Sequence, residues 1–420
     1  MDPAFKRNLG ADRRAEQIAK ATEEQNRLLL EDECYAKKFV ARRDATLLSL
    51  ATVYADKFDR NQIREMADTV CRTAFVRRWR TETGNWEDFV CFEGQEHADR
   101  TLRSDAGVVI TPMHFGNYRL LGFWLVARGH AVHWLSDQEN SNYTRSLMTD
   151  GPITRYLPLS GGQSAQFRVS DLRARFHNID STSPAAAWDM FRALRRGATV
   201  AIFPDGNSGI ENRGTTRHCP QIPFLGQVIS VHTGAAGIAA AAGKSVLPII
   251  PFDLDGTPGL RFEAPIVAGV NESKEKFRFR ATRELFRILE REIIARPLEW
   301  EEWHVLFRWM NREPKSLGPP APERIARSLA RPLEGSTLHL AIPTLWCLNI
   351  NSECHAIDVN TWNSLGTSPE LTGLIDAAEA GMATIKALTQ FENAAAALAA
   401  LELLIGVGFV EIKHISKNGG

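Results

Sequence analysis

The first eighty residues carry apolar positions at the spacing of amphipathic helices. Residues 13–43 form a long mixed-charge stretch without glycine or proline, and residues 60–79 place apolar side chains three or four positions apart. An apolar heptad does not persist through either stretch, which argues against a coiled coil. We therefore predict a helical N-terminal region, residues 1–85, packed on the flank of a larger core.

From residue 86 the pattern changes to apolar runs that alternate with helical stretches. Strands are predicted for the apolar runs 107–113, 131–136, 198–203, 245–252 and 260–267. Helices are predicted for residues 117–129 and 184–197, each ending at a glycine. Apolar strands that alternate with helices predict an α/β fold over residues 86–317, with a mostly parallel central sheet flanked by helices.

A proline-rich, basic stretch at residues 312–332 marks the end of this core. We predict a linker over residues 318–334, followed by a small α+β module with winged-helix character over residues 335–420. The alanine-rich tracts of this module are strong helix formers, which indicates ordered helices rather than low-complexity disorder.

The overall charge is balanced, with 50 lysines and arginines against 50 aspartates and glutamates among 420 residues. No net field therefore selects nucleic acid as a partner. No apolar run reaches the roughly 18–20 residues of a membrane span, and the N-terminus lacks the apolar segment of a signal peptide. The six cysteines include no C-x-x-C pair, so we expect reduced thiols and no metal site. These features predict a cytoplasmic protein with at most peripheral contact to the inner face of a membrane.

Candidate functional residues gather where the predicted strands end. His114 and Asp205 each follow an apolar run directly. The carboxyl ends of parallel strands meet at one edge of a sheet, where ligands bind in open α/β folds. We therefore expect both side chains to point into one crevice, with Phe224, Leu225 and Gly226 forming an apolar wall.

Five sequence blocks follow one another in a fixed order: EGQEH, HFGNYR, RRGATVAIFPDG, IPFLGQ and RPLEWEEWHVLFRW. Over residues 40–315 they resemble the lysophospholipid-acyltransferase-like superfamily, and within it the bacterial lipid A lauroyl/myristoyl acyltransferases. The resemblance implies a glycerolipid-acyltransferase-like fold. It also implies transfer of an acyl group from a thioester of an acyl carrier protein or coenzyme A to a hydroxyl or amine, without a resident cofactor or metal.

The resemblance also assigns roles to individual residues. His114 is implied as the general base for the acceptor, a task that suits an imidazole of near-neutral pKa. From the residues themselves, we expect Asn117 and Arg119 to shape the acceptor side and Gly206 to belong to the substrate-binding residues. Arg213 would bind the phosphates of the donor, with a solvated loop arginine as the alternative. Backbone N–H groups at the predicted helix start, residues 116–117, would stabilise the oxyanion of the tetrahedral intermediate.

Position 119 departs from the family pattern, which has an aspartate or glutamate there to orient the histidine ring. This chain has Arg119, whose guanidinium cannot accept a hydrogen bond. Three arrangements remain open. In the first, Asp205 supplies the carboxylate; in the second, Asp137, Glu139 or Glu211 supplies it. In the third, the site is altered or inactive, or uses a different acceptor, and Arg119 binds an anionic group.

The C-terminal module lies outside this resemblance. It resembles the small winged-helix modules of the pyrroloquinoline-quinone D-like kind, which bind leader or carrier peptides, and a capping or dimerisation domain is the alternative. A peptide or carrier-protein partner would place the enzyme in specialised metabolism. Two other functions stay open for the core: a thioester hydrolase, in which water reaches the base, and a non-catalytic protein that binds thioesters or carriers.

Overall fold

A computed structural model describes residues 3–83, 91–102, 107–137, 139–140, 142, 157–158, 164–165, 174–206, 219–254, 257–310, 312, 315–350 and 353–414. The chain divides into two compact units. Unit 1 comprises Met1–Ala36 and Asp68–Asn311, and unit 2 comprises Lys37–Ala67 and Arg312–Gly420. The division falls inside two helices, α2 (Glu33–Tyr54) and α3 (Arg60–Thr83).

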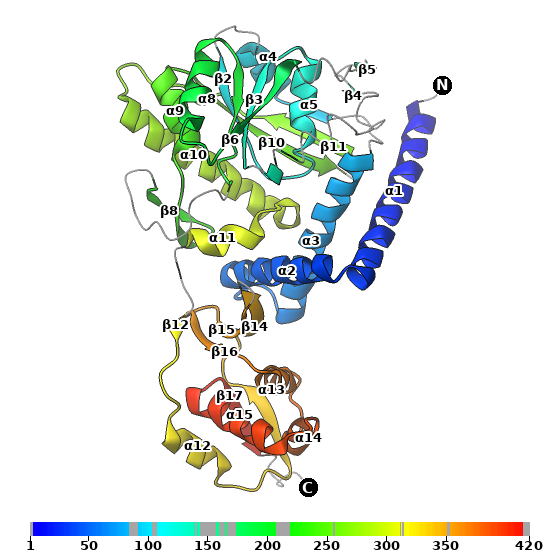
Figure 1. The fold of residues 1–420 in the computed structure, drawn as a ribbon, viewed down its shortest axis with the longest axis vertical. Helices are drawn as coiled ribbons and strands as arrows, with labels where there is room; N and C mark the ends of the chain where they lie inside the picture. The colour runs from blue at the N-terminus through cyan, green and yellow to red at the C-terminus, as the bar shows by residue number, and fades with distance from the viewer. Residues whose placement is uncertain are drawn as a thin grey trace. The chain divides into compact units, whose positions relative to one another are not determined.

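Unit 1 is built on a sheet of seven strands, counted over the described residues. Their order is β1 (Cys91–Glu93), β11 (Thr257–Phe262), β10 (Val246–Leu254), β2 (Val108–Pro112), β7 (Thr199–Ala201), β3 (Val132–Ser136) and β6 (Phe176–Asp180). Neighbouring strands are parallel except β10 and β11, which are antiparallel. The predicted α/β fold with a mostly parallel sheet is confirmed (Figure 1).

Helices cover both faces of this sheet. Ile110 of β2 lies in the apolar cluster that contains helix α5 (Leu120–Ala127), with Trp124 buried among its members. Val109, the preceding residue, lies in the opposite cluster. That cluster takes residues from α8 (Ala186–Arg195), α9 (Gly234–Ala242) and α10 (Lys274–Ala295). A helical layer on each face explains why these strands are continuous apolar runs rather than alternating ones.

The other elements of unit 1 are short apart from its first helix. They are α1 (Pro3–Glu31), α4 (Gln95–Leu102), β4 (Leu157–Pro158), β5 (Ser164–Ala165), β8 (Gln221–Phe224), β9 (Gln227–Ser230), η3 (Pro297–Glu299) and α11 (Trp303–Trp309). In the part of the chain that the structure describes, no helix is both long enough and apolar enough to cross a membrane.

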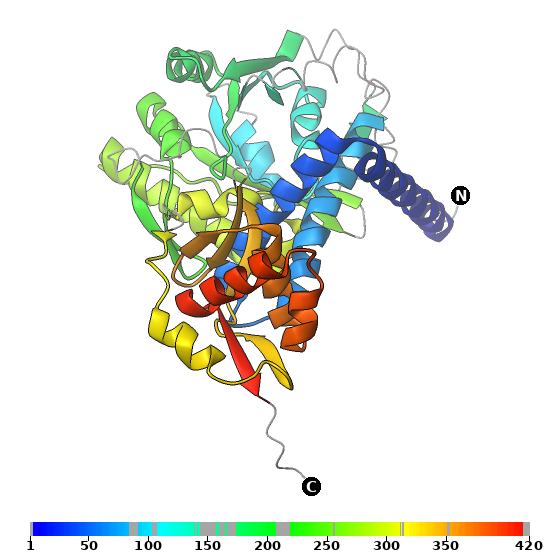
Figure 2. The ribbon, with the colours of Figure 1, turned by 60° about the horizontal axis from the view of Figure 1, so that its bottom comes forward.

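Unit 2 contains a small α+β module. Its elements are β12 (Lys315–Ser316), α12 (Pro322–Leu329), β13 (Ser336–Leu340), β14 (Leu345–Ile350), β15 (Glu353–Asp358), β16 (Asn363–Gly366), α13 (Pro369–Glu379), α14 (Thr384–Thr389), α15 (Ala394–Val407) and β17 (Val410–His414). Strands β12, β16, β15 and β14 form one sheet in that order. Strands β13 and β17, far apart in sequence, lie side by side as an antiparallel pair (Figure 2).

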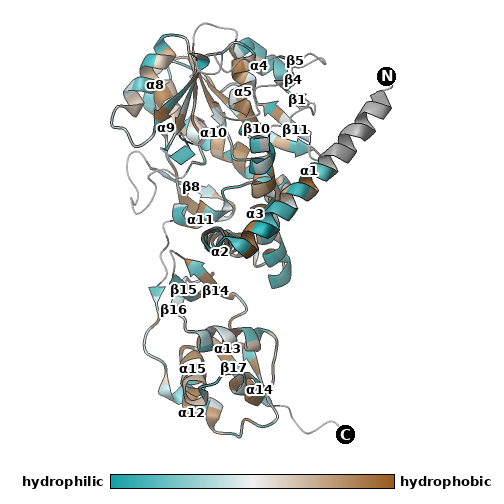
Figure 3. Cartoon of the chain, turned by 45° about the vertical axis from the view of Figure 1, so that its right-hand side comes forward, coloured by the Kyte–Doolittle hydropathy of each residue, from teal (hydrophilic) through white to brown (hydrophobic). Residues whose placement is uncertain are grey.

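The core of the module is apolar and helical. Leu374 of α13 and Leu401 of α15 are buried in one cluster with Leu338 of β13. Figure 3 shows α15 largely in the hydrophobic colours, as expected for a helix rich in alanine and leucine. The predicted linker, residues 318–334, includes helix α12, which packs against α15.

Residues 37–67 belong to unit 2, whereas the sequence analysis assigned them to a region packed on the acyltransferase core. Side chains of α2 and α3 bind the module directly. The Asp44 carboxylate accepts the backbone N–H of Asn349 at 2.9 Å. The Arg60 guanidinium pairs with Glu379 at 2.9 Å and lies 4.0 Å from the ring centre of Trp346. Charged side chains in this stretch therefore find their partners in the module, a pairing that local sequence does not reveal.

Candidate active site

His114 lies directly after β2, on a loop that only glycine allows to close. Gly116 has φ of 47°, and a Cβ atom added there would lie 2.6 Å from the Cα of Phe252 in β10. A side chain at this position would therefore collide with backbone. The glycine of the HFGN motif thus lets the loop pass close to the neighbouring strand and fixes where the histidine stands.

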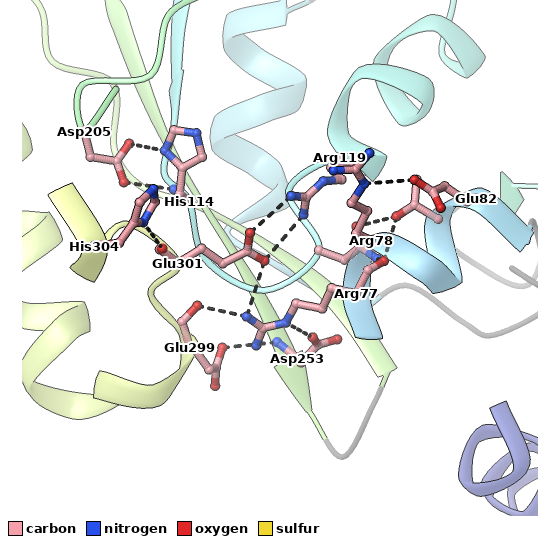
Figure 4. A network of polar contacts seen from close by, with 12 residues as sticks. Arg77, Arg78, Glu82, His114, Arg119, Asp205, Asp253, Glu299, Glu301 and His304 are labelled. Carbon is pink, nitrogen blue, oxygen red and sulfur yellow. Dashed lines mark hydrogen bonds and ion pairs between the residues drawn. The ribbon is translucent and has the colours of Figure 1, made fainter. Parts of the chain in front are cut away.

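Asp205, at the end of the segment that follows β7, is the hydrogen-bond partner of His114. Its Oδ1 lies 3.0 Å from His114 Nδ1, and its Oδ2 accepts the backbone N–H of His114 at 3.0 Å (Figure 4). The Trp300 indole N–H donates to the same Oδ2 at 2.9 Å. The carboxylate is fully buried. Of the three arrangements left open by the sequence, the structure contains the one with Asp205 beside the ring.

This contact fixes the tautomer of the histidine. A carboxylate only accepts hydrogen bonds, so His114 Nδ1 must carry the proton. The lone pair of the neutral ring is then on Nε2, the atom turned away from Asp205. The pair thus has the geometry of a general base with an orienting acid.

Aromatic side chains hold the imidazole in place. The Phe203 ring stacks on His114, with centroids 4.2 Å apart and planes at 26°. The Tyr118 ring meets it edge-on at 4.8 Å. Gly206, predicted as a substrate-binding residue, follows Asp205 in a turn in which its N–H donates to the Phe203 carbonyl. This turn helps to place Phe203 and Asp205 together.

The electrostatic surroundings favour the protonated ring. Burial lowers the pKa of His114. The negative charges of Asp205 and Glu302 act in the opposite direction, helped by the hydrogen bond to Asp205 and the charge of Glu301. Together these effects raise the pKa of His114 above its ordinary value. The neutral ring, which is the form that acts as a base, is therefore fully populated only at a pH above this raised pKa.

Arg119 is paired with an acid that sequence reasoning did not single out. Its guanidinium lies 3.2 Å from the carboxylate of Glu301, which is almost fully buried. Glu301 also lies 3.7 Å from Arg77, and Arg77 pairs with Asp253 at 2.8 Å (Figure 4). The guanidinium of Arg119 in turn lies over the ring of Tyr118. Its charge is therefore balanced inside the protein, which weakens the interpretation that it serves as an anion site.

The predicted roles of residues 116–117 need correction. Helix α5 begins at Leu120, so these residues form a turn before the helix rather than its first N–H groups. The Asn117 side chain is buried and points toward α3. There it accepts from the Thr81 hydroxyl at 3.2 Å and donates to the Arg77 carbonyl at 3.4 Å. Its amide anchors the loop to α3, which explains an asparagine here without a substrate contact.

The predicted apolar wall is a hairpin tip. Leu225 and Gly226 turn the chain between β8 and β9 with φ of 50° and 74°. The Leu225 N–H donates to a carboxylate oxygen of Glu290. Phe224 is buried, and its ring centre lies 6.4 Å from that of Trp300. The hairpin is thus tied to the aromatic residues behind Asp205.

The alternative carboxylates do not replace Asp205 in the described structure. Asp137 accepts the backbone N–H of Asn140 at 2.8 Å, and Glu139 is exposed. Glu211 and Arg213 lie outside the described residues. Among the residues described, no three His, Cys, Asp or Glu side chains cluster as metal ligands would.

A family model described as bacterial lipid A biosynthesis acyltransferase matches residues 45–309. The chain belongs to this family. The match confirms the resemblance seen in the sequence blocks. Within it lies every residue of the candidate site, from Arg77 to Glu301.

Two curated relatives add a finer comparison for this acyltransferase-family chain. It is 25% identical over 158 residues to a phosphatidylinositol mannoside acyltransferase of Mycobacterium tuberculosis, found in two strains. The aligned part covers 37% of this chain and 42% of the relative. The chain therefore spans less than half the length of the relatives it matches.

Several residues of the site were not identified from the sequence; four of them lie inside the five sequence blocks, and Arg77 lies before the first block. They are Arg77, Tyr118, Phe203, Trp300 and Glu301. For Trp300 and Glu301 the available signal was the last block, RPLEWEEWHVLFRW. Its proline and tryptophans are typical of the family, but they do not predict the role of any single side chain.

Proposed function

We propose that this protein is an acyltransferase that moves an acyl group from a thioester of an acyl carrier protein or coenzyme A to a hydroxyl or amine, with His114 as general base. The hydrogen bond between His114 and Asp205 carries the proposal. It holds a basic imidazole, with Nε2 free to accept a proton, at the edge of the sheet where α/β folds bind ligands.

The reaction balances with these two residues. Nε2 of His114 takes the proton of the acceptor O–H or N–H as that atom attacks the thioester carbonyl. The tetrahedral intermediate then collapses, the C–S bond breaks, and the leaving thiolate takes the proton back from the imidazolium. The buried Asp205 carboxylate stabilises the positive ring between these steps, so no covalent acyl-enzyme and no metal is needed.

The acceptor and the setting are further parts of the proposal. The name of the mycobacterial relatives makes a glycolipid hydroxyl the first acceptor class to test. We propose that catalysis takes place on the cytoplasmic side with peripheral membrane contact. If the winged-helix-like module binds a peptide or a carrier protein, the acceptor or donor would reach the site on that partner, in specialised metabolism.

Two other functions compete. A thioester hydrolase would use the same His114 and Asp205 with water as the acceptor. A non-catalytic binding protein would keep the crevice without turnover. The carboxylate partner of His114 favours catalysis over the binding protein. Burying a charge costs free energy, and a protein without activity would gain nothing from keeping the Asp205 carboxylate buried with three hydrogen bonds.

Thiol release from a panel of acyl-coenzyme A and acyl-carrier-protein thioesters tests the proposal, with and without glycolipid acceptors. We expect release by the wild type that His114→Ala abolishes and that an acceptor accelerates. Asp99→Asn is the matched control, because Asp99 is a half-buried aspartate whose ion-pair partner is Arg128 rather than His114. Release that no acceptor accelerates would favour the hydrolase, and no release from any donor would favour the binding protein.

A further inference from the structure

The buried carboxylate of Asp205 has a second side-chain partner besides His114. Oδ1 faces the His114 ring, while Oδ2 receives both the His114 backbone N–H at 3.0 Å and the Trp300 indole N–H at 2.9 Å. An indole N–H carries no net charge. It therefore stabilises the carboxylate without introducing a cation that would compete with the imidazolium.

Trp300 is itself rigidly held. It is fully buried, and its ring meets those of Trp303 at 5.1 Å, Trp309 at 5.8 Å and Phe224 at 6.4 Å. Close packing of large aromatic rings leaves the indole few alternative rotamers. The N–H therefore points at Asp205 without further ordering when substrate binds.

The backbone beside Trp300 holds the histidine as well. Phe115 and Trp300 form an antiparallel bridge, and the Glu301 N–H donates to the His114 carbonyl at 2.9 Å. Two consecutive residues thus bind both members of the pair, one through a side chain and one through the backbone. This segment sets the separation of the His114 ring and the Asp205 carboxylate.

We propose that Trp300 is a positioning residue for acyl transfer: its indole N–H fixes the rotamer of Asp205 and thereby the Nδ1–H tautomer and the direction of the His114 ring. This rests on the proposed function. Without the N–H, Oδ2 keeps one donor, the carboxylate rotates more freely, and more of its negative charge is left for the imidazole.

The test compares Trp300→Phe with Trp303→Phe and Trp309→Phe. Trp303 is equally buried, and its N–H donates to the Pro297 carbonyl at 2.7 Å rather than to Asp205. Trp309 is also fully buried, and its N–H has no partner among the described residues. All three variants remove the same atoms from one aromatic cluster. A merely structural effect would therefore appear in all of them.

We expect kcat of Trp300→Phe to fall about ten- to a hundredfold, the range for a lost hydrogen bond to a charged group, with KM for the thioester nearly unchanged. The acid limb of the pH profile should move to higher pH, since the unshared carboxylate raises the pKa of His114 further. The two control variants should leave this limb in place. Equal losses of kcat in Trp300→Phe and Trp303→Phe, with the limb unmoved, would overturn the proposal.

A measurement that needs no turnover separates this proposal from the proposed function. NMR titration of ring-labelled histidine, assigned with His114→Gln, reports the pKa of His114 directly in the full chain. We expect a higher pKa in Trp300→Phe and no change in Trp303→Phe; an unchanged pKa in both refutes the positioning role even if the wild type proves inactive. If Trp300→Phe does not fold, a benzothienyl-alanine at position 300 replaces only the N–H by sulfur and gives the same test.

Discussion

Replacement of Asp205 by asparagine should invert the tautomer of His114. The asparagine has one oxygen and one NH₂ group to place where the carboxylate had two oxygens. With the NH₂ at the Oδ2 position, it would face the N–H groups of His114 and Trp300 and lose both hydrogen bonds. With the NH₂ at the Oδ1 position, both bonds survive and the NH₂ donates to His114 Nδ1.

The energies of these bonds decide between the two orientations. Each hydrogen bond to the buried carboxylate contributes on the order of 1.5–3 kcal/mol, and a neutral amide acceptor keeps a smaller share of it, about 1 kcal/mol. With the NH₂ at the Oδ1 position, the bonds from the His114 backbone N–H and the Trp300 indole N–H are both retained; with the NH₂ at the Oδ2 position, both are lost. The orientation with the NH₂ at the Oδ1 position should therefore dominate. Nε2 of His114 then carries the proton and has no lone pair for the acceptor. We expect Asp205→Asn to reduce kcat by about 10²–10⁴-fold, which is about 3–5 kcal/mol in the activation free energy.

The pH profile provides an independent check. Among the charges around His114, the negative charge of Asp205 raises the pKa of the ring most, so its removal lowers that pKa. A general base works in its deprotonated form, hence the acid limb of kcat/KM should move to lower pH while the plateau falls. Thiol release measured across neutral pH reports both effects. A variant with wild-type kcat, or with an unmoved acid limb, would show that Asp205 does not orient the ring.

Three further predictions concern stability, measured by urea unfolding. Arg119→Glu places a second carboxylate beside Glu301, which is almost fully buried, and should destabilise unit 1 by about 3 kcal/mol. The double variant Arg119→Glu with Glu301→Arg should recover more than half of that loss, and no recovery would argue against a direct ion pair. Gly116→Ala should cost about 1–3 kcal/mol from its positive φ alone and more from the contact with Phe252, so a variant as stable as the wild type would contradict the loop geometry. Burial raises the pKa of Glu379, but the hydrogen bonds and charges of Arg64 and Arg60 outweigh burial and lower it to about 2. The contribution of Glu379 to the stability of unit 2 is therefore present above the pKa of the unfolded state and is lost as the pH falls toward 2. Glu379→Gln should remove that acid dependence, and an unchanged dependence would argue against the pairing.

The parts of the site that lie on the strands could be predicted from the sequence. His114 and Asp205 follow apolar runs, and the rule that ligands bind at the carboxyl ends of strands was enough to bring them together. The actual contact depends on β2 and β7 being neighbours in the sheet. Strands β3 and β6 lie between them in sequence, so the contact between His114 and Asp205 follows from the strand order of the sheet, which no local pattern encodes.

The parts that come from outside the strands could not be predicted. Arg119 and Glu301 are 182 residues apart, and Trp300 is 95 residues from Asp205. No periodicity links positions at such distances. The role of Asn117 differs from the expectation for another reason. An amide in a motif beside a histidine suggests a substrate contact, but the hydrogen-bonding groups of Asn117 are used by the buried Thr81 hydroxyl and the Arg77 carbonyl of α3.

The arginine at position 119 changes which part of the chain controls the histidine. In the family pattern an acid five positions after the histidine orients the ring, so the motif contains both members of the pair. Here Glu301 is buried and needs a cation, and Arg119 approaches it more closely than Arg77 does, at 3.2 Å against 3.7 Å. An acid at position 119 would remove the nearer of these two cations from Glu301 and add a second negative charge beside it, which is strongly unfavourable. The orientation of His114 must therefore come from elsewhere, and residues 300–301 provide it through Asp205 and through the His114 carbonyl.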